Sequence, residues 1–386
     1  MPEARSPRHP APPARPELLK ARRVVVKIGT TLLTGHTTRV DRRFLLKFCA
    51  AVGRISDQGR EVAIVTSGAI GAGCGALGYA TRPPSLPERQ ACAAAGQVEL
   101  MKLYAQAFRH IRPPRPVGQL LLTRDCLVDR HRYLNVRNTL RLLFKRGAVP
   151  IINENDSVSV EEIRFGDNDT LSALLAGVAQ ADLLVILTDV PGLLEADPRT
   201  HPQARLIPTV DALAPEIEAF ARPSASLLGT GGMVSKLAAA RIGLASGFGV
   251  VLADGHDPAV LLEVLAGREV GTYFHPPGNR ISARKHWLAF ADQPKGAILV
   301  DPGARDALVK RNKSLLPAGI VGVQGSYEAG ELVSLVCGGR EFARGVTDFS
   351  SAQIERIRGQ STAQAAKELG QPLCDEVVHR DNLVIL

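Results

Sequence analysis

The chain has 386 residues, of which 45% are hydrophobic, and a formal net charge of +9. This hydrophobic content is sufficient for buried cores, and at ~100–200 residues per domain the length predicts two domains. No apolar run approaches the ~20 residues that a membrane-spanning helix requires. The first twenty residues contain six prolines and lack the apolar region of a signal peptide. These features exclude a membrane-spanning protein and predict a cytoplasmic one.

The net positive charge is spread along the chain and does not mark a surface for nucleic acid. Residues 1–23 carry +4, from six basic and two acidic side chains, whereas residues 295–386 carry eleven of each sign. Since no basic stripe is present, RNA binding is not expected. The six cysteines form no CxxC pair and the nine histidines form no HExxH pattern. The sequence therefore predicts no metal site built from protein ligands.

The pattern along the chain predicts a tail followed by an α/β domain. Residues 1–20 are rich in proline and arginine and lack periodicity, as in a disordered tail. From Arg23 to about Phe274, short β-branched runs alternate with longer helical patterns. The runs are Val24–Val26, Val62–Val65, Val149–Ile152, Leu183–Leu187 and Val250–Leu252, and the helical stretches are Arg89–Ile111, Arg130–Lys145, Thr170–Ala179 and Val234–Ala245. Apolar strands joined by helices predict a mostly parallel open sheet sandwiched by helices.

After Pro276 the pattern changes to short strands separated by glycine-rich turns, as at Ile320–Val323 and Leu332–Val336. This pattern predicts a small, mostly β domain. The expected organisation is a disordered tail over residues 1–20, an α/β domain over 21–280, a linker over 281–294 and the β domain over 295–386.

Polar motifs follow the predicted strands. Four runs lead into Lys27-Ile28-Gly29-Thr30, Thr66-Ser67-Gly68-Ala69, Asn153-Glu154-Asn155-Asp156 and Thr188-Asp189-Val190-Pro191-Gly192. A fifth motif, Gly229-Thr230-Gly231-Gly232-Met233, opens the helix that carries Lys236. Ligands of open parallel sheets bind beyond the carboxyl ends of the strands. The five motifs together therefore predict one binding site.

The groups at this edge suit a phosphate ligand. Glycines after a strand let backbone N–H groups approach an anion, and the start of a helix adds a favourable dipole. Lys27 and Lys236 would add compact positive charges, although each could also be an ordinary surface lysine. Neither segment is a Walker A loop. The run Gly73–Gly78 satisfies GxGxxG, but it begins well after the strand that ends at Val65, so we interpret it as a close-packed glycine turn.

The order of these motifs, together with Phe165-Gly166-Asp167-Asn168-Asp169, resembles the glutamate 5-kinases of the amino-acid kinase family. The resemblance runs from about Arg23 to the C-terminus. The Gly-Asp-Asn-Asp and Gly-Thr-Gly-Gly-Met elements distinguish these enzymes from aspartate, acetylglutamate and uridylate kinases. The segments Ser314–Ile320 and His379–Asp381 make the C-terminal domain similar to the PUA domain of the bacterial enzymes. One departure is Val234-Ser235 before Lys236, where a polar pair is more common.

The resemblance implies an ATP-dependent phosphotransferase that phosphorylates the γ-carboxylate of L-glutamate, at the first step of proline biosynthesis. Lys27, Lys236 and Asp169 would be catalytic, with Asp169 orienting the two lysines. The residues around ATP would be Lys27, Gly29, Thr188, Asp189, Thr230, Gly231, Gly232, Met233, Val234, Ser235 and Lys236. Glutamate would be held by Ser67, Gly68, Asp156 and Asn168.

The resemblance also implies Mg²⁺ carried mainly by phosphates and water, feedback inhibition by proline, and a homo-oligomer, often a tetramer. The γ-carboxylate, with a pKa of ~4.3, is already ionised at neutral pH and needs no general base. Two alternatives stay open. One is a kinase that acts on another small carboxylate. The other is an RNA-binding regulator acting through the PUA-like domain, although the balanced charge and few aromatic residues of that domain count against it.

Overall fold

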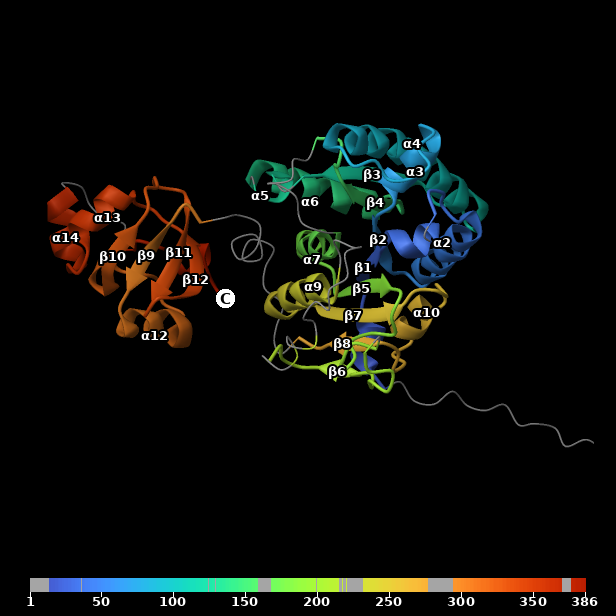
Figure 1. Ribbon diagram of the computed structural model, residues 1–386. Helices are drawn as coiled ribbons and strands as arrows, with labels where there is room; N and C mark the ends of the chain where they lie inside the picture. The colour runs from blue at the N-terminus through green and yellow to red at the C-terminus, as the bar shows by residue number, and fades with distance from the viewer. Residues whose placement is uncertain are drawn as a thin grey trace, which may run out of the picture.

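The computed structural model describes residues 14–35, 37–123, 125–128, 130–158, 168–198, 200–214, 217, 220, 232–276, 294–369 and 376–386. Within these ranges two sheets are formed, one of eight strands and one of five (Figure 1). No helix of the described part is long and apolar enough to cross a membrane.

The larger sheet is mostly parallel, as predicted. Its strand order is β3-β4-β2-β1-β5-β7-β8-β6. The strands are β1 (Arg23–Ile28), β2 (Glu61–Thr66), β3 (Val117–Leu122), β4 (Val149–Glu154), β5 (Leu183–Thr188), β6 (Thr209–Val210), β7 (Gly249–Asp254) and β8 (Thr272–Phe274). All neighbours pair in parallel except β7 and β8, which run antiparallel. All five predicted strands belong to this sheet, whereas β3, β6 and β8 were not predicted.

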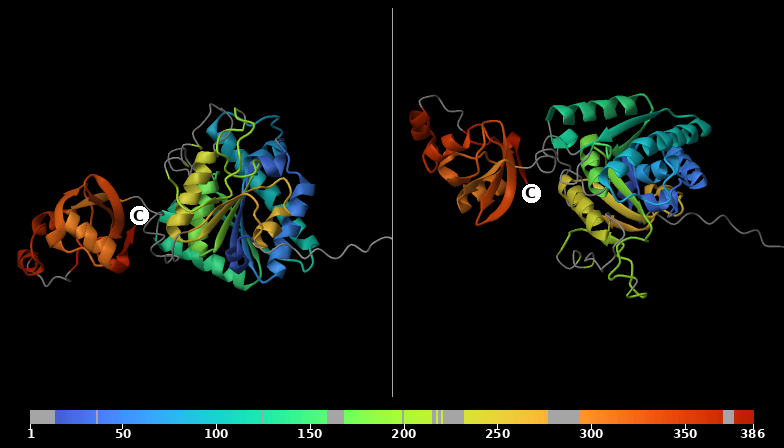
Figure 2. Two further views of the ribbon diagram at one scale, coloured as in Figure 1. Left: turned by 90° about the horizontal axis from the view of Figure 1, so that it is seen from below. Right: turned by 45° about the horizontal axis from the view of Figure 1, so that its top comes forward.

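Helices cover both faces of this sheet (Figure 2). Alternate residues of the central strands enter two separate cores, because successive side chains of a strand point to opposite faces. The core that contains Val24 and Val26 packs against α2 (Arg42–Asp57), α4 (Leu86–His110) and α10 (Val260–Leu265). The core that contains Val25 packs against α6 (Arg130–Lys145), α7 (Asn168–Ala179) and α9 (Met233–Ser246).

The first four residues of the GxGxxG run end a helix, and Leu77 and Gly78 form the turn that follows it. Helix α3 (Ala69–Ala76) contains Gly73 and lies directly on α4. A Cβ on Gly73 would come within 1.7 Å of the carbonyl oxygen of Cys92, and a Cβ on Gly96 within 1.8 Å of that of Ala69. The glycines are therefore required by the close approach of two helix backbones. The prediction of close packing was correct, and the assignment to a turn was right for Leu77 and Gly78 but wrong for residues 73–76.

The end of the predicted tail is ordered. Residues Pro16–Lys20 form a 3₁₀ helix, η1, in which Leu18 is buried. The guanidinium group of Arg15 donates hydrogen bonds to the carbonyl oxygens of Val270 at 2.8 Å and Pro208 at 2.6 Å. The prediction of disorder over residues 1–20 was wrong for residues 15–20, because a single buried arginine satisfies backbone carbonyls of the sheet. Residues 1–13 lie outside the described part of the chain.

The C-terminal sheet has a core of its own and the strand order β10-β9-β11-β12-β13. Its strands are β9 (Gly296–Val300), β10 (Ile320–Gln324), β11 (Leu332–Cys337), β12 (Arg340–Val346) and β13 (Leu383–Ile385). Three α-helices accompany it: α12 (Pro302–Arg311), α13 (Ser351–Ile357) and α14 (Thr362–Leu369). Both strands predicted here are present. Except for Pro294, the predicted linker lies outside the described residues.

Candidate active site

The parallel pairing brings the predicted polar motifs to one edge of the sheet. β1, β2, β4, β5 and β7 run in the same direction, so their carboxyl ends lie side by side. The motifs that follow four of these strands therefore meet there, as predicted. The start of α9 reaches the same place, since the Lys236 side chain contacts the first turn of α7.

Two lysines and one aspartate form a buried ionic cluster. Lys27 lies two residues after Val25 on β1, and its side chain therefore points to the face that α7 and α9 cover. Its Nζ lies 2.6 Å from Asp169 Oδ1, and the Nζ of Lys236 lies 3.2 Å from Asp169 Oδ2. Asp169 is fully buried, and each lysine is only 7% exposed. These three side chains carry two positive charges and one negative charge, which leaves an excess of one positive charge.

The cluster keeps Asp169 ionised. Burial alone would raise the pKa of this carboxyl group, because a low-dielectric interior disfavours its charged form. The charges of Lys27 and Lys236, with hydrogen bonds from Lys27 and Ser235, outweigh burial and hold the pKa below its ordinary value. The ionised carboxylate of Asp169 attracts both ammonium groups and fixes their positions, because each of its oxygens pairs with one lysine.

Ser235 also contacts this carboxylate. Its hydroxyl donates to Asp169 Oδ2 at 2.7 Å and lies 2.8 Å from the carbonyl oxygen of Gly232. The serine is buried in the first turn of α9, directly before Lys236. The sequence had placed Ser235 among the nucleotide-binding residues, whereas here its hydroxyl faces Asp169.

A chain of amide side chains continues from the cluster. Asn168 Nδ2 donates to the carbonyl oxygen of Thr66 at 2.9 Å, to Ser67 Oγ at 2.8 Å and to Asn153 Oδ1 at 3.0 Å. Asn153 Nδ2 in turn donates to Gln97 Oε1 at 3.1 Å. The structure thus joins Ser67 and Asn168, two of the predicted glutamate-binding residues. Asn153 and Gln97 had been given no role, although an amide in the Ala-rich stretch of α4 is a detectable signal.

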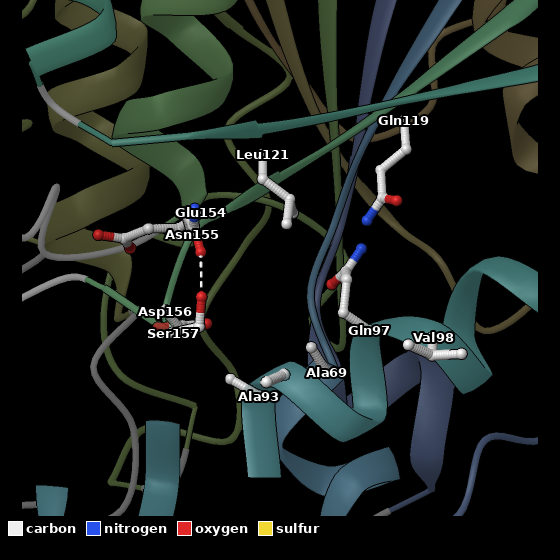
Figure 3. Close-up of a pocket in the computed structure, with 11 residues that line it drawn as sticks. Ala69, Ala93, Gln97, Val98, Gln119, Leu121, Glu154, Asn155, Asp156 and Ser157 are labelled. Atoms are coloured by element: carbon white, nitrogen blue, oxygen red, sulfur yellow. Dashed lines mark hydrogen bonds between the residues drawn. The ribbon is translucent and has the colours of Figure 1, made fainter. Parts of the chain in front are cut away.

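A pocket of about 290 Å³ lies beside this amide chain, the hydrogen-bonded side chains of Asn168, Asn153 and Gln97 (Figure 3). Asp156, a third predicted glutamate-binding residue, lines it together with Glu154, Asn155, Ser157, Gln97, Gln119 and Leu121, and four further residues of α3 and α4 complete the wall. Gly68, the fourth predicted residue, precedes α3 with φ of 95°, a left-handed conformation that favours glycine. The volume is just below the range of roughly 300–1,000 Å³ found for small-molecule sites.

The remaining predicted nucleotide-binding residues lie at the ends of β1 and β5 and at the start of α9. A Cβ on Gly29 would lie 3.7 Å from Lys27 Nζ, so the glycine leaves this ammonium group accessible from that side. Thr188 is buried and donates to the exposed Asp189 at 3.2 Å. Gly232 caps α9, which begins with Met233 and the exposed Val234. Thr230 and Gly231, like Phe165–Asp167, lie outside the described residues.

Known proteins resemble the chain over both domains. Residues 22–253 match the model of the amino acid kinase family, and residues 296–369 match that of the PUA domain. The "Glutamate 5-kinase" of Citrifermentans bemidjiense is 48% identical over 374 residues, which cover 96% of this chain and 100% of the relative. That of Geobacter metallireducens is 47% identical over 371 residues, with 96% and 99% covered.

Solved structures resemble part of the chain. A carbamate kinase from Giardia lamblia bound to AMP-PNP covers 67% of this chain and 99% of its own, at 20% identity and a TM-score of 0.49. The match to the family model spans more than half of the chain, and the full-length relatives agree with it. This chain belongs to the amino acid kinase family.

Proposed function

We propose that this chain is a glutamate 5-kinase, which transfers the γ-phosphoryl group of ATP to the side-chain carboxylate of L-glutamate and forms L-glutamyl 5-phosphate. The observation that carries the proposal is the buried pair of lysines held by Asp169. Relatives that carry this name are 44–48% identical over nearly the whole chain, which favours glutamate over other small carboxylates and over an RNA-binding regulator. In this role the chain would act in proline biosynthesis.

The reaction requires two anions to meet. The γ-carboxylate, with a pKa of ~4.3, is ionised at neutral pH and attacks the γ-phosphorus without a general base. Unit charges ~4 Å apart repel by roughly 4 kcal/mol at an effective dielectric constant near 20. Lys27 would offset this repulsion at the ATP phosphates, and Lys236 would stabilise the charge that develops on the phosphoryl group during transfer. Asp169 would hold both ammonium groups in place.

The residues that would bind ATP and those that would bind glutamate occupy different parts of the sheet edge. ATP would lie against Gly29, Thr188, Asp189 and the segment from Thr230 to Lys236. Glutamate would be held by Ser67, Gly68, Asp156 and Asn168, next to the pocket of Figure 3. These roles are implied by the family resemblance, and the position of the motifs around the ionic cluster supports them.

Mg²⁺ would arrive with the ATP phosphates and neutralise part of their charge. Such an ion keeps several waters and binds substrate phosphates, so few protein ligands are required. In the described residues, no three His, Cys, Asp or Glu side chains lie together in a way that could hold a metal ion. We further propose inhibition by proline, assembly into a homo-oligomer such as a tetramer, and a cytoplasmic location, all from the family resemblance.

Release of ADP with glutamate, aspartate and N-acetylglutamate as acceptors tests the proposal directly. Glutamate should be phosphorylated with the highest kcat/KM, and a preference for either other acceptor would contradict the proposal. The variant Lys236→Ala should lower kcat by more than it raises the KM for glutamate, because its charge acts on the transferring group. An increase in KM alone would assign Lys236 to ground-state binding.

A further inference from the structure

The pocket beside the amide chain contains a buried donor whose partner is missing. The side chain of Gln97 lies on α4 and is 93% buried, since Gln97 is only 7% exposed. Its Oε1 accepts a hydrogen bond from Asn153, but its Nε2 has no hydrogen-bond partner within the described part of the chain. Buried amide groups are normally hydrogen-bonded, so a donor left in this state at the wall of a pocket points to a ligand.

Backbone groups fix which end of the Gln97 amide faces the pocket. The backbone N–H of Glu154 can only donate, and it donates to Asn153 Oδ1 at 2.9 Å. The Nδ2 of Asn153 must therefore point the other way, where it donates to Gln97 Oε1 at 3.1 Å. Rotating the Gln97 amide would place two NH₂ groups face to face. The nitrogen of Gln97 is consequently the end that is left for the pocket.

The position of this nitrogen agrees with a ligand site. Gln97 lines the pocket of about 290 Å³ together with Asp156 and Gln119. Figure 3 shows the nitrogen of the Gln97 amide on the side of Gln119, whose own amide nitrogen is directed toward it, and Asp156 on the opposite side of the pocket. A donor on one side and a carboxylate on the other suit a small molecule that carries both an acceptor and a positive group.

We propose that Gln97 Nε2 binds the α-carboxylate of the amino-acid substrate and thereby selects α-amino dicarboxylic acids with a free α-carboxylate. The proposal rests on the proposed function. The carboxylate that is phosphorylated must lie beside the lysines at Asp169, which directly follows Asn168 in the chain. Gln97 is two hydrogen bonds away from Asn168 along the amide chain, through Asn153. A substrate with carboxylates at both ends would place the unreacted one at Gln97.

The test compares L-glutamate with its α-amide, L-isoglutamine, in the full-length protein. The variant Gln97→Glu keeps the shape and the acceptor for Asn153, but it replaces the donor with a negative charge. We expect the KM for glutamate to rise about 10-fold or more and the KM for ATP to stay unchanged, as for loss of a hydrogen bond to a charged group. The preference for glutamate over the α-amide, measured as substrate or competitive inhibitor, should fall about 10-fold or more, because the α-amide can donate to the new carboxylate.

Matched variants separate recognition from packing. Gln106→Glu makes the same change at an exposed position of α4 and should alter neither constant. Gln97→Met removes the donor without adding charge, together with the acceptor of Asn153. It should also lower the preference for glutamate, which covers the case in which Gln97→Glu fails to fold. An equal loss for both ligands in either folded variant would show a purely structural role and overturn the proposal.

The activity of the wild-type protein separates a failure of the proposed function from a failure of the role of Gln97. If it releases no ADP with glutamate, both the proposed function and the role of Gln97 are refuted. If it phosphorylates glutamate and the variants keep its preference for glutamate over the α-amide, only the role of Gln97 is refuted.

Discussion

Replacing Asp169 with asparagine should destabilise the α/β domain strongly. The carboxylate is fully buried, with Lys27 Nζ at 2.6 Å and Lys236 Nζ at 3.2 Å. The asparagine side chain has nearly the same shape but no charge. Two buried ammonium groups would then face each other without the anion that compensates them.

The size of the effect follows from the charges. Two ammonium groups left beside each other repel by a few kcal/mol, since unit charges ~4 Å apart repel by roughly 4 kcal/mol at an effective dielectric constant near 20. Measured losses for breaking one partner of a buried ion pair are about 3–5 kcal/mol. For a domain of this size each kcal/mol lowers the melting temperature by roughly 2–4 °C. The melting temperature of Asp169→Asn should therefore fall by ~6–20 °C at neutral pH.

The pH dependence of this difference has a definite sign. Because the folded-state pKa of Asp169 is lowered, the unfolded chain binds the proton more tightly than the folded one. The stabilisation is therefore complete above the unfolded pKa of ~3.9. It is lost as the pH falls through the lower, folded pKa. Wild type and variant should differ by a constant amount between pH 5 and 8 and converge only in strong acid.

Thermal unfolding followed by circular dichroism measures both quantities. Asp57→Asn is the matched control, because Asp57 pairs with Arg115 at 2.7 Å on the surface of the same domain. Exposed pairs contribute about 0–1 kcal/mol, so this variant should melt within a few degrees of wild type. A drop below 3 °C for Asp169→Asn, or a difference that grows with rising pH above 5, would refute the buried-ion account.

Three further predictions concern the hydrogen bond of Ser235, the packing of Gly96 and the two ends of the chain. Ser235→Ala should lower kcat about 10-fold because Asp169 loses the hydrogen bond from this hydroxyl, whereas Ser235→Thr keeps the hydroxyl and should keep the wild-type kcat. Equal kcat values for Ser235→Ala and wild type in steady-state assays would contradict this. Gly96→Ala should lower the free energy of unfolding by about 1–3 kcal/mol and raise the KM for glutamate, since the new Cβ would collide with the Ala69 carbonyl oxygen. An unchanged midpoint of denaturant unfolding would contradict this. Residues 14–276 alone should retain kinase activity, and starting at residue 21 should lower the melting temperature; a folded but inactive 14–276 chain would place an essential group in the C-terminal domain.

The central strands were predictable because they are buried on both faces. Runs such as Val24–Val26 and Leu183–Leu187 are continuous and apolar, and this pattern admits few other interpretations. The edge strand β3 was missed, since it is only partly buried and contains Gly118. Its residues follow no strict alternation, so tertiary pairing with β4 decides its conformation.

The meeting of the motifs at one sheet edge was also predictable, but the contacts between them were not. Strand direction placed Lys27 and Thr188 at that edge, whereas the ionic bridge through Asp169 was expected only from a family resemblance. Gln97 was not predicted, because a single glutamine on a helix is usually solvated, and its place in an alanine-rich stretch was the only signal that set it apart. Arg15 was assigned to a disordered tail, since the carbonyl groups that it contacts lie more than 190 residues away in the sequence.

The two layers of helices contribute different halves of the site. The ionic cluster belongs to the face covered by α7 and α9, because Lys27 shares its strand face with Val25. Gln97 comes from α4, which covers the opposite face. Asn153 connects the two layers, since it lies next to the last residue of β4 and bonds to side chains from both. A dicarboxylic substrate bound at both points would cross the edge of the sheet, with one carboxylate at each layer. The separation between Gln97 and the ionic cluster would then determine which length of substrate can reach both.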